Sequence, residues 1–140
     1  MILDNKDHKI IAVLRDNARI SIRDLAKKTN LRPSTVHQRI KRLKQEKVIE
    51  KYTLKLNNKA IEENFIAFIL ANTKKDLDQI TLANKHIKEV FGITGEYDII
   101  MKLKFKDVEE FNDFILKFRK ELAIKETLTM VVTANIKEEL

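Results

Sequence analysis

The stretch Leu25–Ile49, LAKKTNLRPSTVHQRIKRLKQEKVI, decides the fold of the first part of this chain. A short helix ends before Asn30, a residue that tolerates a left-handed backbone. The next helix begins at Pro33, which suits the first helical position. Apolar residues recur in this helix at i, i+4 and i+7, so one face carries Val36, Ile40 and Leu43. Two helices joined by a tight turn predict a helix-turn-helix unit.

The opposite face of the helix at Pro33 is polar and cationic, as a helix that lies in a DNA groove must be. Glutamine can make two hydrogen bonds to adenine, and lysine can donate to guanine. We expect contacts to base edges from Ser34, His37, Gln38 and Lys41, and contacts to phosphates from Arg32, Thr35 and Arg42. The alternative is a solvated polar surface. For Arg39, which flanks the buried face, an ion pair with a nearby acid and a phosphate contact are equal expectations.

The positive charge of the chain is concentrated in its first third. Residues 1–50 contain thirteen Lys and Arg but six Asp and Glu, whereas residues 51–140 contain fifteen of each, and the net charge is +7. A basic unit joined to a neutral one is typical of a protein that binds a polyanion. The chain has no cysteine, which excludes disulfides, thiolate metal sites and cysteine nucleophiles.

Local signals also predict how the first helices begin. Asp4 is a good N-cap for a helix that ends near Asn17, and Asp7 completes a capping box with Asp in place of Glu. Ser21 caps the short helix before the turn. Arg32 takes the N-cap position of the helix at Pro33, although its side chain has no acceptor for the helix amides.

Residues 51–56 alternate between polar and apolar side chains, with Tyr52, Leu54 and Leu56 on one side. This alternation predicts a strand with one face to cover. A lone strand after a helical domain needs a partner, so we expect it to pair with its copy in a second subunit. The predicted organisation is a helix-turn-helix domain over 1–50, a linker strand over 51–61 and a second domain over 62–140.

The second domain has the pattern strand, helix, strand, strand, helix, strand. We expect these elements over Phe65–Ala71, Asp76–Lys88, Val90–Thr94, Ile99–Phe105, Asp107–Leu122 and Leu128–Ala134. The βαββαβ order predicts a ferredoxin-like domain, and the chain as a whole an α+β fold. The helices of such a domain cover one face of the sheet, so the other face favours a dimer.

The chain resembles the Lrp/AsnC family, the feast/famine transcription regulators, and in particular its archaeal type. The resemblance spans almost the whole length and rests on Leu3-Asp4 with Asp7, Asn17-Ala18-Arg19, Leu25-Ala26, Thr35-Val36, Arg39-Ile40, Leu43, Val48-Ile49 and Thr94-Gly95-Glu96-Tyr97-Asp98. It implies an N-terminal winged-type helix-turn-helix domain that binds DNA. It also implies a C-terminal domain that dimerises, often assembles further, and in many members binds amino acids between dimers.

The resemblance assigns an effector loop at residues 95–98, and the chain departs from the family pattern at two positions. By itself the loop is a hairpin turn; by resemblance its members Gly95, Glu96, Tyr97 and Asp98 hold an amino-acid effector. Family members usually have a capping residue where this chain has Arg32, and glycine where it has Lys47. The first change loses a cap worth roughly 1 kcal/mol.

The predicted function is sequence-specific binding of double-stranded DNA in transcription regulation, as a homodimer, tetramer or octamer. One alternative is an architectural protein that coats DNA with little specificity, and another is an amino-acid-sensing module. We find no catalytic motif, metal-ligand spacing or cofactor loop, and so expect no enzyme. His8 and His86 are interpreted as ordinary helix-surface residues. The absence of an apolar run or leader predicts a cytoplasmic protein without membrane contact.

Overall fold

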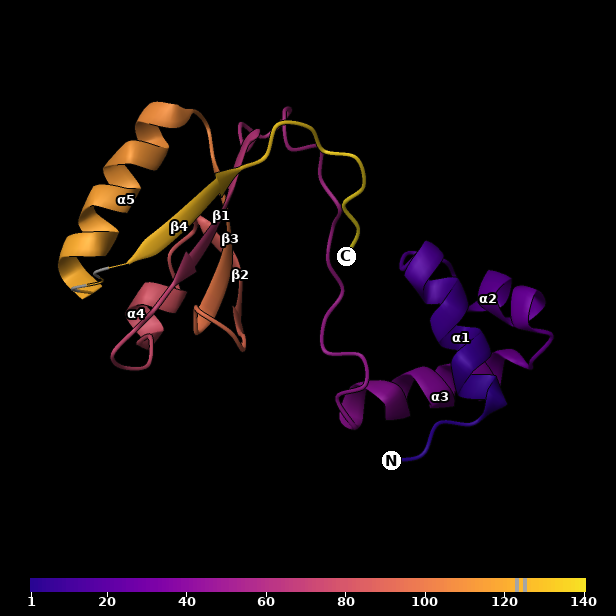
Figure 1. The fold of residues 1–140 in the computed structure, drawn as a ribbon. Coiled ribbons are helices and arrows are strands. Elements are labelled where there is room, and N and C mark those ends of the chain that lie inside the picture. The colour runs from indigo at the N-terminus through magenta and orange to yellow at the C-terminus, as the bar shows by residue number, and fades with distance from the viewer. Residues whose placement is uncertain (123, 125) are drawn as a thin grey trace. The chain divides into compact units, whose positions relative to one another are not determined.

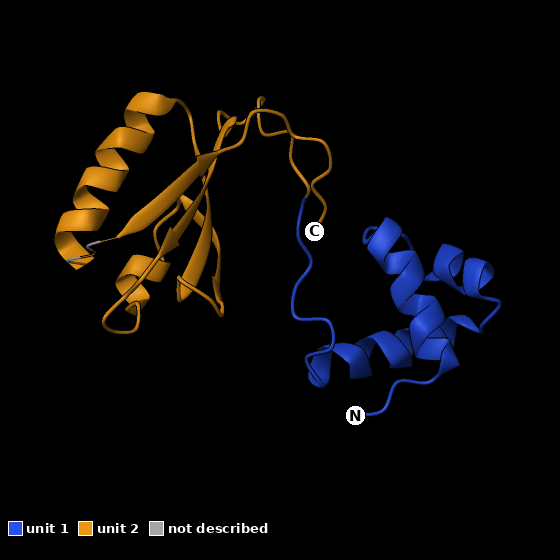
Figure 2. Cartoon of the chain, viewed as in Figure 1, with its two compact units in different colours: residues 1–54 blue, residues 55–140 orange. Residues whose placement is uncertain are grey.

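A computed structural model describes residues 1–122, 124 and 126–140. The chain divides into two compact units, residues 1–54 and residues 55–140 (Figure 2). The first unit, all of which is described, contains three helices and no strand, and the second contains a four-stranded sheet with helices (Figure 1). The predicted α+β fold is therefore confirmed.

The first unit is a helix-turn-helix of α1 (Asn5–Asp16), α2 (Ile22–Thr29) and α3 (Pro33–Gln45). Its core is formed by side chains from all three helices, which are Ile10, Leu25, Ala26, Val36 and Leu43. Each large aliphatic side chain buried in this way stabilises the fold by roughly 1.5–3 kcal/mol. Because the inward face of α3 is fixed by this core, its outward face is fixed as well.

The predicted helix ends are confirmed. Asp4 and Asp7 form a reciprocal capping box, in which each carboxylate accepts the other's backbone amide at 3.0 Å. The Ser21 hydroxyl accepts the Asp24 amide at 3.0 Å. Asn30 ends α2 with a φ of 55°, in the left-handed region.

The second unit contains β1 (Phe65–Ala71), α4 (Gln79–Leu82), β2 (Ile87–Gly92), β3 (Ile99–Phe105), α5 (Val108–Leu122) and β4 (Thr127–Val131). All neighbouring strands are antiparallel, in the spatial order β2-β3-β1-β4 (Figure 1). This is the order of a ferredoxin-like sheet. The strand predicted over Phe65–Ala71 is found with the same bounds, and Asp107 caps α5 by accepting the Glu110 amide at 2.9 Å.

The two faces of the sheet differ in what covers them. One face packs against α5 through Phe111, Ile115 and Phe118, which contact the alternate strand residues Ala67, Ile69, Ala71, Met101, Leu103 and Phe105. The other face carries the intervening positions. There Leu128 and Met130 are each 45% exposed in the single chain. This face is called the open face below.

In the single chain residues 51–56 form no strand, and their expected pairing with a second copy stays a prediction. Two other expected elements are wrong in extent. The predicted helix 76–88 shrinks to α4, capped by Asp78 instead of Asp76. The Asn84 carboxamide then accepts the His86 amide at 2.9 Å and turns the chain into β2, which begins at Ile87 instead of Val90.

The last strand also ends early, at Val131 instead of Ala134. Ala67 pairs with Val131, and β1 starts only two residues before Ala67. The residues that follow β4 therefore have almost no length of β1 left to pair with. No helix in the described part of the chain is long and apolar enough to cross a membrane.

Candidate nucleic-acid interface

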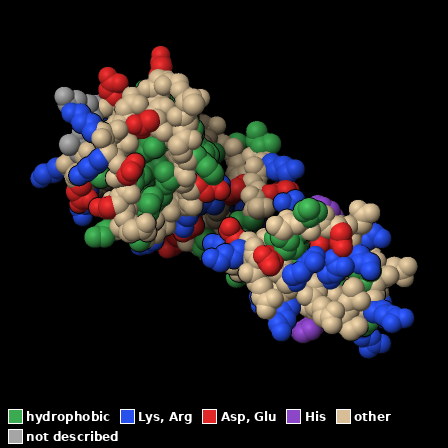
Figure 3. Space-filling view, turned by 90° about the horizontal axis from the view of Figure 1, so that it is seen from below, with side chains coloured by type: hydrophobic (Ala, Val, Ile, Leu, Met, Phe, Trp, Pro, Cys, Tyr) green, Lys and Arg blue, Asp and Glu red, His purple; other side chains and the backbone are tan. Residues whose placement is uncertain are grey.

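Helix α3 presents two distinct faces. Its buried side holds Val36 and Leu43, which have no exposed surface. The opposite side carries four exposed side chains, which are those expected at base edges: Ser34, His37, Gln38 and Lys41. Lys and Arg side chains gather over the same unit, in the right-hand part of Figure 3. The polar face of α3 is therefore exposed, and it belongs to a unit whose surface is rich in Lys and Arg.

A buried carboxylate joins the start of α1 to the middle of α3. The Asp7 side chain is fully buried, and one of its oxygens lies 2.6 Å from Nη2 of Arg42. Its other oxygen lies 3.3 Å from Nη1 of Arg39, which in turn lies 2.6 Å from Asp4. A buried carboxylate needs such partners because it has lost its hydration. We call Asp4, Asp7, Arg39 and Arg42 the aspartate–arginine network.

This network lowers the pKa of the Asp4 carboxyl. The hydrogen bond from the Asp7 amide is the largest cause, followed by the hydrogen bond from Arg39, and together they bring the pKa of Asp4 to about 2. The hydrogen bonds from the Arg39 guanidinium to Asp4 and to Asp7 raise the pKa of Arg39. For Arg39, the ion pair is thus the interaction that the folded chain makes.

The residues expected at phosphates are found in three different states. Arg32 is exposed at the N-cap of α3 and makes no side-chain cap bond, as its side-chain chemistry predicts. Thr35 is half-buried. Arg42 is 42% exposed in its side chain, but its guanidinium is already paired with Asp7. A phosphate contact from Arg42 would therefore share that guanidinium with a buried acid.

The end of α3 shows the effect of the departure at Lys47. The amides of Val48 and Ile49 both donate to the Leu43 carbonyl, at 2.9 and 3.0 Å. This closure places Lys47 at a φ of 56°, in the left-handed region where glycine is favoured. The chain thus keeps the helix ending that glycine suits while holding a lysine there.

The loop assigned to an effector lies between β2 and β3. Gly95 has a φ of 118°, a conformation that other residues rarely adopt. The Asp98 carboxylate accepts the Thr73 amide at 3.0–3.1 Å, and the Asn72 side chain bonds both to the Glu96 carbonyl at 2.8 Å and to the Asp98 amide at 3.0 Å. Sequence reasoning missed Asn72 and Thr73, which directly follow β1 and position this loop.

Glu96 is exposed and Tyr97 is half-buried, so the surface of the loop carries a carboxylate and part of an aromatic side chain. Asp98, in contrast, is occupied by its bonds to the chain. The loop is thus a rigid turn with one free acid.

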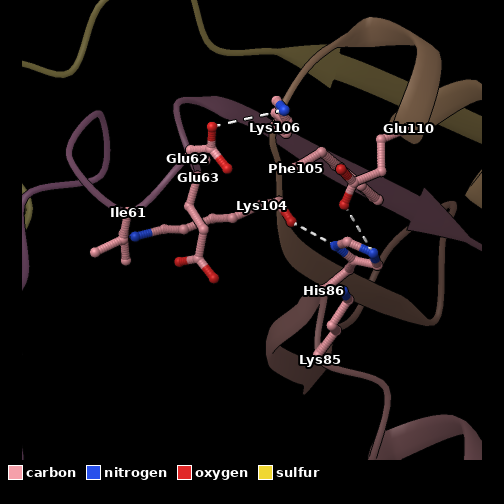
Figure 4. Close-up of a pocket in the computed structure, with 9 residues that line it drawn as sticks. All are labelled: Ile61, Glu62, Glu63, Lys85, His86, Lys104, Phe105, Lys106 and Glu110. Carbon is pink, nitrogen blue, oxygen red and sulfur yellow. Dashed lines mark hydrogen bonds and ion pairs between the residues drawn. The ribbon is translucent and has the colours of Figure 1, made fainter.

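A cavity of about 200 Å³ lies at the other end of β3, around His86 (Figure 4). Nδ1 of His86 lies 2.9 Å from the Lys104 carbonyl and Nε2 lies 3.0 Å from Glu110. The ring stacks on Phe105 at 4.6 Å. The interpretation of His86 as a helix-surface residue is wrong, because it lies before an edge strand and packs inward.

Both acceptors face His86, so the ring satisfies them together only as a donor from both nitrogens. The other acids of the cavity are also paired, Glu62 with Lys106 at 3.6 Å and Glu63 with Lys88 at 2.7 Å. These internal pairs favour a structural role for the cavity. The described residues contain no group of three side chains suited to a metal ion.

A helix-turn-helix with a free cationic face, joined to a ferredoxin-like unit, defines the class of DNA-binding transcriptional regulators. Residues 3–50 match a family model described as winged helix-turn-helix DNA-binding. Residues 66–140 match the Lrp/AsnC ligand binding domain. The chain therefore belongs to the Lrp/AsnC family, as its motifs predict.

Similar proteins are found in archaea of the genus Pyrococcus. The HTH-type transcriptional regulator FL11 of Pyrococcus furiosus is 37% identical over 142 residues, which cover 98% of this chain and 93% of that protein. An HTH-type transcriptional regulator of Pyrococcus abyssi is 38% identical over 98% of this chain and 96% of its own length.

Solved structures share the fold over the whole length. A transcriptional regulator of Neisseria meningitidis in complex with L-Met has a TM-score of 0.88 at 25% identity, covering 99% of this chain and 94% of that one. LrpC of Bacillus subtilis has a TM-score of 0.87 at 26% identity, covering 99% and 100%.

Proposed function

We propose that this regulator reads DNA sequence with the exposed face of α3, through Ser34, His37, Gln38 and Lys41. The observation that carries the proposal is the exposure of all four side chains on the side of α3 opposite to its core. The side chain of Gln38 suits a bidentate contact to adenine, and Lys41 suits donation to guanine. The N-terminal half of a recognition helix is also the part that approaches base edges.

Phosphate contacts are proposed for Arg32, Thr35 and Arg42, which flank this face. Arg32 is the strongest of the three because it is exposed and has no cap bond within the chain. The positive excess of residues 1–50 supplies the attraction that does not depend on sequence.

A homodimer is proposed through the open face of the sheet, with residues 51–61 as the linker. Leu128 and Met130 would then be buried against a second copy, and the unpaired segment 51–56 would gain a strand partner in it. The proposed functional division remains 1–50 for DNA, 51–61 for the linker and 62–140 for assembly and effector binding. Further assembly into tetramers or octamers would build on the same dimer.

Modulation by an amino acid is proposed at Gly95, Glu96, Tyr97 and Asp98. Support comes from the L-Met complex of the Neisseria meningitidis regulator and from the ligand-binding family model. Glu96 is exposed and would pair with the ammonium group of the amino acid. Isothermal titration with L-Met and other amino acids tests this. Glu96→Gln should weaken binding, whereas Glu109→Gln, an exposed acid of α5, should not.

Selection of binding sites from random duplexes at physiological salt tests the DNA proposal. We expect enrichment of near-palindromic sites whose halves lie about one helical turn, roughly 34–36 Å, apart. Strong binding with a steep salt dependence and no enrichment would contradict sequence reading. That result would favour an architectural protein that coats DNA.

A further inference from the structure

The segment that leads from α3 toward β1 is anchored at each end but unpaired along its length. At its start, the Ile49 amide donates to the Leu43 carbonyl at 3.0 Å. At its end, a turn begins at Asn57, whose carbonyl accepts the Ile61 amide at 3.2 Å. Between these points, none of the backbone amides of residues 50–56 donates to a backbone carbonyl of the residues that the structure describes. Unpaired backbone of this kind is a template for a strand of another chain.

Side chains anchor the end of this segment further. The Asn58 carboxamide accepts a bond from Lys104 at 2.7 Å and donates to Glu138 at 3.0 Å. Glu138 lies in the tail after β4 and also pairs with Lys102 and, at 3.3 Å, with Lys55. The stretch that is free to pair therefore ends near residue 57, and only a few registers are open to it.

The apolar side chains of the segment lack cover in the single chain. Tyr52, Leu54 and Leu56 are 48%, 68% and 47% exposed. They alternate with polar residues, so a strand at this position would place all three on one face. A cavity of about 300 Å³ lies against the same segment and is lined by Ala18, Arg19, Tyr52, Thr53 and Leu54. An apolar strand with free backbone groups of its own fits these features.

A second copy of the chain provides such a strand. Antiparallel pairing of a segment with its own copy repeats every contact about a two-fold axis. Directly opposite residues point to the same face of the pair. The apolar side chains of both copies therefore share one face only when some residue lies opposite its own copy. Because both ends of the segment are anchored, that residue must be central, which leaves Thr53, Leu54 and Lys55.

Charge excludes two of these three registers. If Thr53 lay opposite its copy, Lys51 would lie opposite the partner's Lys55. If Lys55 lay opposite its copy, the two Lys55 side chains would face each other. Like charges directly opposite destabilise a strand pair. With Leu54 opposite its copy, no lysine of the segment lies opposite another lysine.

We propose that the linker segments of two copies pair antiparallel with Leu54 opposite the partner's Leu54, an inference that rests on the proposed homodimer. Tyr52 then lies opposite the partner's Leu56, on the face that lines the cavity, and that leucine fills the space beside Ala18. The register matters for DNA binding because it fixes how far along the chain each helix-turn-helix unit lies from the two-fold axis.

The chain has no cysteine, so disulfides between single introduced cysteines report the register. Opposite residues of an antiparallel pair have Cα atoms roughly 4.5–5.5 Å apart, which a disulfide can span, whereas diagonal neighbours are too far apart. We expect Leu54→Cys to crosslink the full chain under mild oxidation. Thr53→Cys and Lys55→Cys should each fail to crosslink alone. Mixed together, these two variants should crosslink, because their positions lie opposite each other.

Two measurements control this experiment. Leu116→Cys, at a position of α5 that is 68% exposed, reports chance collisions and should not crosslink. Sedimentation equilibrium under reducing conditions gives the dimer affinity of the unmodified chain and of each variant, so a missing crosslink can be separated from a missing dimer.

The cavity is tested by filling it. Ala18→Leu should weaken dimerisation at least roughly five-fold, because the added side chain occupies the space of the partner's Leu56. Ala12→Leu, at an exposed alanine of α1, should leave dimerisation unchanged. In a Leu56→Ala background, Ala18→Leu should cost less than it does in the unmodified chain, since the leucine that it displaces is gone.

The outcomes are distinct. Crosslinking of Thr53→Cys or Lys55→Cys alone would overturn the register, and so would a dimeric Leu54→Cys that forms no crosslink; in both cases the proposed homodimer stands. Additive effects of Ala18→Leu and Leu56→Ala would overturn the assignment of the cavity. An unmodified chain that stays monomeric at all concentrations would overturn the proposed homodimer and the register with it.

Discussion

Each unit buries a carboxylate among cationic side chains, but the two carboxylates connect different kinds of structural element. Asp7 is fully buried and joins two helices that an apolar core already packs together. Glu138 is 12% exposed and joins two irregular segments to a strand. The partners also differ, since Asp7 receives rigid arginines and Glu138 receives flexible lysines. Loss of the first should cost stability in a packed unit, whereas loss of the second leaves lysines whose long side chains can reach water.

The largest expected effect is that of Asp7→Asn. It leaves Arg42, which is 42% exposed, without its acid and leaves Arg39 with Asp4 alone, and the loss of these charge-assisted bonds costs about 1–3 kcal/mol. We expect the helix-turn-helix unit to unfold at much lower denaturant concentration, followed by far-ultraviolet circular dichroism. Asp16→Asn, at an exposed acid of the same helix, is the control. Equal stability of the two variants would show that the buried position of Asp7 does not matter.

Gln38→Ala sharpens the comparison by changing binding without touching either carboxylate. Loss of a bidentate contact should cost about 1–3 kcal/mol of discrimination at one base pair, with the unfolding free energy unchanged. Gel shifts on the selected and a scrambled duplex measure this. Gln45→Ala, at the C-terminal end of α3, should bind as the unmodified chain does. Equal losses on both duplexes for Gln38→Ala would exclude base reading at that position.

Arg32→Ala should act differently from Gln38→Ala. Loss of one phosphate contact weakens binding to all sequences alike and reduces the salt slope by about 1. Affinities on both duplexes over a range of salt concentrations measure it. A loss confined to the selected duplex would place Arg32 at a base edge instead.

Lys47→Gly addresses a strained residue in the unit that holds Asp7. Glycine adopts the φ of 56° found there without a steric penalty, so the substitution should stabilise the unit by about 1 kcal/mol. Denaturation midpoints measure the gain. Lys44→Gly, in the last turn of α3, is the control and should destabilise. A destabilising Lys47→Gly would show that the lysine side chain compensates for its backbone.

The smallest effect concerns pH. In the unfolded chain Asp4 protonates near its ordinary pKa of 3.8, whereas in the fold its pKa is about 2. The folded state therefore binds fewer protons in this window, so its stability is complete above about pH 4 and falls as pH drops toward 2. Acid unfolding of Asp4→Asn should lack this part of the pH dependence. An unchanged acid profile would show that Asp4 does not contribute.

Signals that act over a few residues were predicted well. The capping box at Asp4, the left-handed Asn30 and the buried run of β1 follow from neighbours at fixed short spacing. Predictions that depended on distant partners did worse. The strand over 51–56 is not formed by the single chain, and α4 is cut short because Ile87 pairs with Leu103 on β3.

The functional residues divide in the same way. The exposed face of α3 was predicted because helical periodicity alone separates Gln38 from Val36. The positions of Asn72 and Thr73 under the effector loop were not, since they lie 24–26 residues from the residues that they bind.

By itself, the sequence determined that this chain carries a basic helix-turn-helix and a βαββαβ unit, because capping, periodicity and charge are local properties. Only the tertiary structure decided which acids become buried centres. Arg42 lies 35 residues from Asp7, and Lys55 lies 83 residues from Glu138. Charged residues are common throughout the chain, and only packing brings particular ones together and removes water from them, which gives each pair its effect.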